Sequence, residues 1–482
     1  MQTLDQWIEK QYRHSAAQML RSISPLGIVK TRAGFGQQVR PLRGAIVASP
    51  VPGAYDPDPD YFFHWYRDSA VVIDALRLLA AQSNTSGAAD VPGATERGHF
   101  ADFVRFSLAL RGLDGRRLAA LPLWRARVAP DFVRYLRSDA ELCAAHGEAV
   151  AGETRVNPDG TLDISQWARP QHDGPALRAL TLLRWCALGG PDAALQADVS
   201  ELLRADLAYT LAHAQVPCFD IWEEERGLHY YTLRVAAAAL ARGADWLERG
   251  AAAGAAHGDG LDAQACRAQA RALRGMLDGY WLAEEGYYRS RLLPSGERSP
   301  KELDIAVILA ALHADGPDDP PEPADSDGGS DRSGAHGVQD PRMHATLERL
   351  AAFFEAEYPI NHGRGAGRAP AMGRYPGDRY YSGGAYYFST LGAAEFCFRA
   401  ARADGATDAA VLARRGDAFL ETVRAFTPAD GELSEQFDQR SGAPTSARQL
   451  AWSYAAFISC IVARRRLGYN PLASSQPPRA GQ

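Results

Sequence analysis

Residues 217–232 read Pro-Cys-Phe-Asp-Ile-Trp-Glu-Glu-Glu-Arg-Gly-Leu-His-Tyr-Tyr-Thr, and an alanine-rich helical pattern begins near the end of this stretch. Three carboxylates in a row, Glu223 to Glu225, follow Trp222. Adjacent carboxylates repel each other and an apolar neighbour adds desolvation, and both effects favour a protonated acid near neutral pH. An arbitrary acidic run is usually a solvated turn. Here aromatic residues flank the run on both sides, which favours a sugar site that combines flat apolar faces with acids.

A second acidic stretch has the same character. Residues 431–438 read Gly-Glu-Leu-Ser-Glu-Gln-Phe-Asp, and Trp452 opens the helical pattern that follows. Glu435 therefore lies among polar and aromatic residues just before a helix. Two such sites suggest the paired carboxylates of a glycosidase, although their spacing along the chain does not show that they meet in space.

Six segments carry long motifs: 60–69 (DYFFHWYRDS), 167–179 (WARPQHDGPALRA), 220–224 (DIWEE), 373–378 (GRYPGD), 434–438 (SEQFD) and 452–456 (WSYAA). Together, and in this order, they resemble the glucoamylases of glycoside hydrolase family 15. The resemblance extends from residue 4 to about residue 466. Two departures affect fine specificity rather than the reaction: Tyr386 replaces a tryptophan on which the family stacks sugar, and Gln449 stands where the family often has an aspartate.

The resemblance implies the catalytic roles. Glu223, the first glutamate after the tryptophan, would be the general acid that protonates the glycosidic oxygen. Glu435 would be the general base that activates water on the opposite face of the sugar. Such a pair inverts the anomeric configuration, and its carboxyl groups are expected to lie roughly 6.5–9.5 Å apart.

The resemblance also implies the binding residues. Arg67 and Asp68 would bind hydroxyls of the terminal glucose, Glu224 would bind the sugar on the leaving-group side, and Arg374 would bind nearby. The aromatic members of the predicted site are Trp65, Trp167, Trp222, Tyr386 and Trp452.

Taken singly, several of these residues have purely structural explanations. Arg67 and Asp68 could form an ion pair at the start of a helix, and the tryptophans could pack in the core. Asp173 fits a helix cap better than a catalytic group. Asp438 and Glu225 are interpreted as supporting or solvated residues.

Helical patterns predict an all-α fold. They lie at about 3–23, 71–79, 97–112, 173–188, 193–215, 228–249, 261–282, 302–314, 341–357, 382–404, 406–426 and 446–466. Twelve helices in alternating order suggest six helical hairpins closed into an (α/α)6 toroid, which the resemblance also implies. The site motifs precede even-numbered helices and would therefore gather at one end of the barrel.

We interpret residues 1–470 as one catalytic domain and 471–482 as a frayed tail. Residues 315–340 are acidic and rich in proline and glycine, which predicts a flexible surface loop. A short strand is expected at 45–48. The irregular stretch at 113–171 is long for a compact domain, and such loops usually line a site.

The chain has 482 residues, a net charge of −6 and six widely spaced cysteines. This composition gives no indication of a nucleic acid partner, a metal or another cofactor. No apolar run is long enough to span a membrane, and no signal peptide is visible, so a cytoplasmic location is expected unless a leader was removed.

The favoured function is an exo-acting, inverting hydrolase of α-1,4-linked gluco-oligosaccharides, with short soluble chains preferred to granular starch. The same machinery could instead act on isomalto-oligosaccharides or trehalose. A toroid that binds carbohydrate without catalysis is a further alternative. The presence of both Glu223 and Glu435 argues against it, because a scaffold needs neither.

Overall fold

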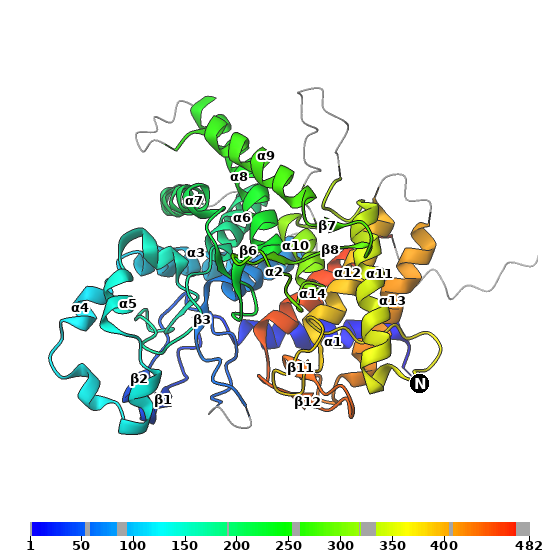
Figure 1. The fold of residues 1–482 in the computed structure, drawn as a ribbon, viewed down its shortest axis with the longest axis horizontal. Helices are drawn as coiled ribbons and strands as arrows, with labels where there is room; N and C mark the ends of the chain where they lie inside the picture. The colour runs from blue at the N-terminus through cyan, green and yellow to red at the C-terminus, as the bar shows by residue number, and fades with distance from the viewer. Residues whose placement is uncertain are drawn as a thin grey trace, which may run out of the picture.

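The computed structural model describes residues 2–53, 58–83, 94–189, 192–252, 261–317, 319, 334–403 and 408–468. Within this part of the chain, six helices form an inner ring in which each contacts the next and the last contacts the first. They are α2 (Tyr66–Ser83), α6 (Asp173–Ala187), α8 (Tyr230–Ala252), α10 (Ala306–Ala314), α12 (Tyr387–Arg402) and α14 (Ala451–Arg465). The predicted (α/α)6 toroid is confirmed (Figure 1).

One outer helix packs against each inner helix. The outer helices are α1 (Leu4–Leu20), α3 (Ala94–Leu110), α7 (Ala193–His213), α9 (Ala263–Asp278), α11 (Pro341–Glu357) and α13 (Ala409–Phe426). In Figure 1, α7, α9, α11 and α13 lie around the central group formed by α6, α8, α10 and α12. The first helix, α1, packs on the last, α14.

Burial explains the composition of the two layers. Inner helices contact neighbours on both sides as well as an outer helix, and α8 is accordingly buried throughout 235–240. Outer helices have one solvated face, and several begin with a side chain that caps the free backbone N–H groups. Thr3 and Gln6 form a capping box on α1, and Asp262 accepts from the backbone of Ala265 at the start of α9.

Irregular structure fills the connections. The described stretch after α3 contains α4 (Gly115–Ala119), α5 (Asp139–Ala144), and the 3-10 segments η2 (Trp124–Arg127), η3 (Pro130–Tyr135) and η4 (Gly147–Gly152). Two further 3-10 segments are η1 (Ala33–Phe35) and η5 (Pro359–Asn361).

Short antiparallel strands precede several inner helices. Their pairs and bounds are β1 (Lys30–Arg32) with β2 (Gln37–Val39), β3 (His64–Trp65) with β4 (Arg155–Val156), and β7 (Trp281–Leu282) with β8 (Tyr287–Tyr288). Two three-stranded sheets are β5 (Cys218–Phe219), β6 (Arg226–His229) and β9 (Arg291–Leu292), and β10 (Ala385–Tyr386), β11 (Gln436–Phe437) and β12 (Pro444–Thr445). These sheets order the loops that lead into α2, α8, α12 and α14.

The strands explain where helix boundaries differ from the sequence prediction. Helix α8 begins at Tyr230 and α12 at Tyr387 because β6 and β10 occupy the residues before them. The strand expected at 45–48 makes only an isolated bridge between Ile46 and Ile23. Asp173 starts α6, but its N-cap is His172 and no side-chain cap bond forms.

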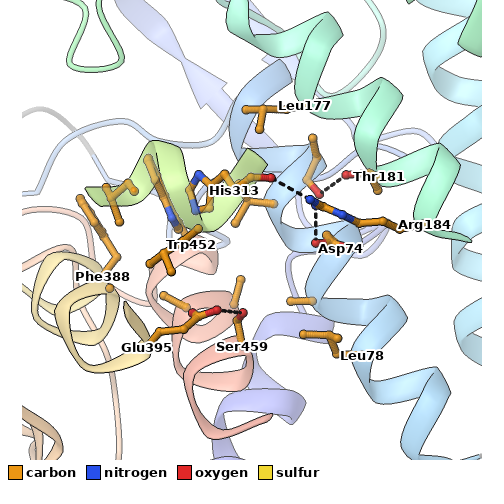
Figure 2. A pocket seen from close by; sticks show the side chains of 18 of the residues that line it. Asp74, Leu78, Leu177, Thr181, Arg184, His313, Phe388, Glu395, Trp452 and Ser459 are labelled. Atoms are coloured by element: carbon orange, nitrogen blue, oxygen red, sulfur yellow. Dashed lines mark hydrogen bonds and ion pairs between the residues drawn. The ribbon is translucent and has the colours of Figure 1, made fainter. Parts of the chain in front are cut away.

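The inside of the ring is polar in places. A cavity of about 40 Å³ lies among the inner helices, and its lining combines aliphatic, aromatic and charged side chains (Figure 2). Within it, Arg184 Nη1 lies 2.9 Å from Asp74 Oδ2, and Ser459 donates to Glu395 at 2.7 Å.

Two aspartates fix the described start of the segment predicted as a flexible loop. Asp319 lies 2.9 Å from Arg184 Nη2 and also pairs with Arg242, while Asp315 Oδ2 lies 2.6 Å from Arg234 Nη2. Residues 318 and 320–333, together with the predicted tail at 471–482, lie outside the described residues. The predicted loop is thus anchored by ion pairs at its first residues.

We expect Asp319→Asn to lower the free energy of unfolding by about 1–3 kcal/mol, because it weakens the shared contacts of buried Arg184 and half-buried Arg242, which keep Asp74 and Asp315 as second partners. The matched control is Glu348→Gln, which removes a pair to Arg415 from a carboxylate that is 60% exposed, and it should cost about 0–1 kcal/mol. Urea unfolding of both variants provides the measurement. Equal losses would contradict the assignment of Asp319 as an anchor.

Candidate active site

The acidic run sits in a strained turn between β5 and β6. Asp220 Oδ1 accepts from the backbone N–H of Glu224 at 2.8 Å, and Arg291 Nη1 holds the other oxygen of Asp220 at 2.7 Å. Glu223 itself has φ +67°, in the left-handed region that side chains other than glycine rarely adopt. Such strain persists only where the surroundings enforce it, and it is typical of functional positions.

Three nitrogen donors converge on the Glu223 carboxylate. Trp65 Nε1 donates to Oε1 at 2.7 Å, Arg67 Nη2 donates to the same oxygen at 3.1 Å, and the indole N–H of Trp167 donates to Oε2. The three donors come from β3, α2 and the segment before α6, so the first part of the chain fixes the carboxylate in place.

The buried side chain of Arg67 contacts several polar residues of the site. Its Nη1 donates to Asp173 Oδ2 at 3.0 Å and to Gln171 at 3.1 Å. Its Nε makes no hydrogen bond among the described residues and lies 3.8 Å from Asp68 Oδ2. Burial raises the pKa of Asp68 to about 6, although Arg67 acts in the opposite direction. Asp173, expected as a helix cap, instead positions Arg67.

Glu435 precedes β11 and is deeply buried. Tyr61 donates to Oε1 at 3.3 Å and the Ser446 hydroxyl donates to Oε2. Burial raises the pKa of Glu435 to about 7, while the Ser446 hydrogen bond and the charge of Arg374 act in the opposite direction. A carboxylate with this pKa is half ionised near neutral pH, as a general base requires.

An aromatic pair lies between the two glutamates. The rings of Tyr61 and Trp65 are 5.2 Å apart at their centroids. Tyr61 donates to Glu435, whereas Trp65 donates to Glu223. The structure therefore brings together both predicted catalytic residues and separates them by this ring pair.

Cations neutralise the other glutamates of the run. Glu224 is held by Lys301 Nζ at 2.6 Å and Arg374 Nη2 at 3.1 Å, and the Tyr375 hydroxyl also donates to it. Glu225 pairs with Arg291 at 2.8 Å. The mutual repulsion expected from the sequence is thus offset, and Glu225 is a paired structural residue rather than a solvated one.

Arg374 and Trp222 link this group to the core. Arg374 donates to both oxygens of Asp378, at 2.7 and 2.6 Å, and its guanidinium lies 5.3 Å from the Trp222 ring. Trp222 Nε1 donates to Asp304 at 2.8 Å. Both predicted binding residues therefore lie beside the Glu223–Glu225 turn.

Tyr386 and Trp452 are two of the three buried aromatic residues of the predicted site, and Trp65 is the third. Tyr386 is 0% exposed, and its hydroxyl accepts from Gln436 at 2.7 Å and donates to Asp378. Its ring has no face open to a sugar, so the interpretation of Tyr386 as a stacking surface is wrong. Trp452 stacks on Phe388 with centroids 4.6 Å apart, and Arg67 lies 5.8 Å from its ring. Trp452 forms the floor beneath Arg67.

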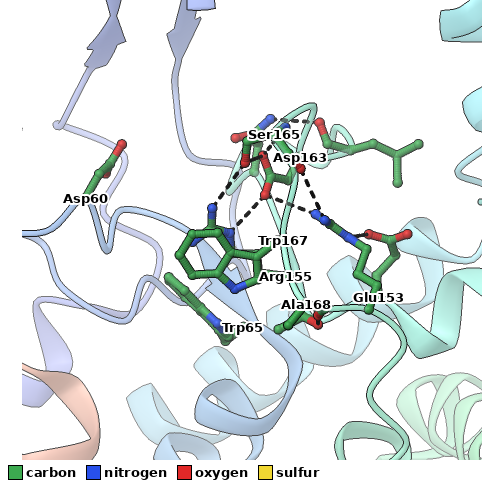
Figure 3. A network of polar contacts seen from close by, with 12 residues as sticks. Asp60, Trp65, Glu153, Arg155, Asp163, Ser165, Trp167 and Ala168 are labelled. Atoms are coloured by element: carbon green, nitrogen blue, oxygen red, sulfur yellow. Dashed lines mark hydrogen bonds and ion pairs between the residues drawn. The ribbon is translucent and has the colours of Figure 1, made fainter. Parts of the chain in front are cut away.

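Trp167 is the exposed aromatic wall of the site. It is 40% exposed, and the guanidinium of Arg155 stacks 3.4 Å from its ring (Figure 3). Arg155 is fixed by Asp163 at 2.9 Å (Figure 3), and Arg169 links Asp163 to Glu153. The irregular stretch at 113–171 thus lines the site, as its length suggested.

Sequence reasoning missed several contributors. Tyr61 and Asp378 lie inside quoted motifs, so their position beside acidic and aromatic neighbours could have identified them. Ser446 and Lys301 carry no local signal, because they reach Glu435 and Glu224 only through the fold.

Within the described ranges, no cluster of three or more His, Cys, Asp or Glu side chains is arranged to hold a metal ion. The helices in the same ranges include none with the length and apolar character needed to cross a bilayer.

An α/α barrel with two carboxylates beside aromatic and arginine side chains at one end defines a glycoside hydrolase. A sequence model of the glycosyl hydrolases family 15 matches residues 151–462, and the chain belongs to this family.

Similar proteins include Glucoamylase 1 of Rhizopus oryzae, with 25% identity over 96% of this chain and 71% of that protein. A glucoamylase of Neurospora crassa is 27% identical over 89% of this chain and 64% of its own length. Among solved structures, the Hypocrea jecorina family 15 glucoamylase superposes with a TM-score of 0.73 at 23% identity, covering 99% of this chain and 76% of that chain. The structural likeness supports the fold.

We expect kcat/KM to fall about tenfold per pH unit below about pH 7, because Glu435 takes up a proton and can no longer accept one from water. Ser446→Ala removes a hydrogen bond that lowers the pKa of Glu435. The fall in kcat/KM at low pH, the acid limb of the profile, should therefore move to higher pH. Ser441→Ala, in a nearby exposed turn, is the control and should leave the limb in place. A pH profile of kcat/KM measures both, and a limb that Ser446→Ala leaves unmoved would contradict the assignment.

Proposed function

We propose that the protein is an exo-acting, inverting α-glucoside hydrolase that releases β-D-glucose from the non-reducing ends of α-1,4-linked gluco-oligosaccharides. The observation that carries this proposal is that the two glutamates are hydrogen bonded to different rings of the Tyr61–Trp65 pair. Tyr61 donates to Glu435 and Trp65 donates to Glu223. An inverting pair of this kind needs its two carboxyl groups on separate supports, so that one can act on the glycosidic oxygen and the other on water.

In the proposed reaction Glu223 gives a proton to the glycosidic oxygen as the bond from that oxygen to the anomeric carbon breaks. A water molecule forms the new bond to this carbon from the opposite face and passes a proton to Glu435. The donors around Glu223 then stabilise the carboxylate that remains after proton transfer. Solvent restores both protonation states before the next turnover.

Exo action is supported by the buried polar groups beside Glu223. Arg67 and Asp68 are buried, and the Trp452 ring lies beneath Arg67. The Arg67 Nε, which has no hydrogen-bond partner among the described residues, offers a donor to a sugar hydroxyl. These polar groups suit the several hydroxyls of a terminal, non-reducing glucose better than the interior of a chain.

The α-1,4 linkage is supported by the glucoamylase names of the relatives. On the leaving-group side, Glu224 is fixed by Lys301 and Tyr375 and so presents a rigid polar edge. Relative kcat/KM values for maltose, isomaltose and trehalose decide between the proposed linkage and the alternatives. No turnover of any of the three would instead support a toroid that only binds carbohydrate.

The first product is expected to be β-glucose, because the water attacks opposite the departing oxygen. Proton NMR during early hydrolysis of maltose distinguishes the anomers before mutarotation mixes them. A glycosidase in which one carboxylate acts as nucleophile would retain the configuration. Initial α-glucose would therefore rule out the inverting assignment.

Substitution of each glutamate should separate their roles. Glu223→Gln is expected to lose about 10²–10⁴-fold in kcat on maltose but much less on an α-glucoside with a good leaving group, which needs little protonation. Glu435→Gln should lose activity on both substrates, since both need activated water. Glu224→Gln, next in the chain, is the comparison and should mainly raise KM. If Glu224→Gln, rather than Glu223→Gln, lost much less activity on the substrate with the good leaving group than on maltose, the general acid would be Glu224.

A further inference from the structure

A cleft separate from the proposed active site lies next to the residues that position Glu223. Its volume is about 500 Å³, and it is bounded by α3, α6, α7 and η4. This volume is within the range of about 300–1,000 Å³ typical of small-molecule sites, and the proposed reaction does not use the cleft. In Figure 1, α3 and α7 lie side by side in the left half of the view.

The cleft contains an unsatisfied hydroxyl. Ser107 on α3 lines it, is 1% exposed, and its Oγ makes no hydrogen bond among the described residues. Leaving such a group buried without a partner costs about 1–3 kcal/mol. A ligand hydroxyl placed in the cleft would remove this cost.

The charges that line the cleft balance. They are Arg111, Arg178, Arg204, Glu148, Glu201 and Asp206. Arg178 binds both oxygens of Asp206, at 2.7 and 2.8 Å, and Arg111 lies 2.8 Å from Glu201. Because the lining carries equal numbers of cations and anions, it favours a neutral ligand with many hydroxyl groups over an anion. Leu110, Val150 and Ala208 supply apolar surface for the C–H faces of such a ligand.

We propose that this cleft is a second carbohydrate site, distinct from the catalytic pocket, which binds a neutral mono- or disaccharide. It shares its wall with the active site. Tyr66 lines the cleft, while its chain neighbours Trp65 and Arg67 contact Glu223. Tyr209 also lines the cleft and bonds His172 at 2.8 Å, immediately before the Asp173 that positions Arg67.

Titration calorimetry of the Glu435→Gln protein with maltose tests the proposal, because the substitution prevents turnover during the measurement. We expect two binding sites in this background. Adding Ala208→Trp, at an exposed position that lines the cleft, should fill it and remove one site. Adding Ala197→Trp, at an exposed position of the same helix away from the cleft, should leave both. Ser107→Val should weaken the cleft site about three- to tenfold.

The outcomes are distinct. A single site in the parent protein, or two sites that survive Ala208→Trp in a folded protein, would overturn the proposal. Binding of inorganic phosphate, but not of maltose, at a site lost in Ala208→Trp would show an anion site and overturn the assignment to sugar. If Ala208→Trp does not fold, the Ser107→Val affinity decides in the same way. Turnover of maltose by Glu435→Gln would count against the proposed catalytic role and not against the cleft.

Discussion

A buried guanidinium holds the active site together. Arg67 on α2 reaches Gln171 and Asp173 at the start of α6 and Glu223 in the β5–β6 turn, so its side chain joins three segments of the chain. Burying an arginine is costly unless most of its donors are paired, and the bonds from Nη1 and Nη2 fix the positions of these three partners. The site therefore depends on the helical ring, which brings the three segments together. The contacts of Arg67 in turn hold these segments in place.

The sequence was sufficient for the fold because its strongest signals are local. Apolar periodicity located all twelve long helices of the described chain, and their alternating order implied two layers. Boundaries were less predictable, as β6 and β10 show. These strands occupy residues with helical patterns because their partners, β5 and β11, lie beside them only in the folded protein. Pairing across the chain overrode local preference.

Site residues could be predicted where their chemical type and motif indicate a role. They could not be predicted where the role depends on whether the side chain is buried. The motifs of Glu223, Glu435 and Arg67 predicted their roles, and the fold connects them through hydrogen bonds to Glu223 and the Tyr61–Trp65 pair. Tyr386 was misinterpreted because an aromatic ring looks the same in sequence whether it lines a pocket or fills the core. Likewise, the acidic run suggested repulsion, while Lys301 and Arg291, which neutralise it, are distant in sequence.

The closed ring also constrains how the chain is made. Helix α2 completes its contacts only when α14 packs beside it, and α1 packs on α14 as well. During translation, the apolar faces of α1 and α2 lack their α14 partner until nearly the whole chain has been synthesised. Long-range closure of this kind slows folding and leaves intermediates prone to aggregation. Synthesis of this protein is therefore expected to depend on chaperones that shield α1 and α2 until α14 emerges.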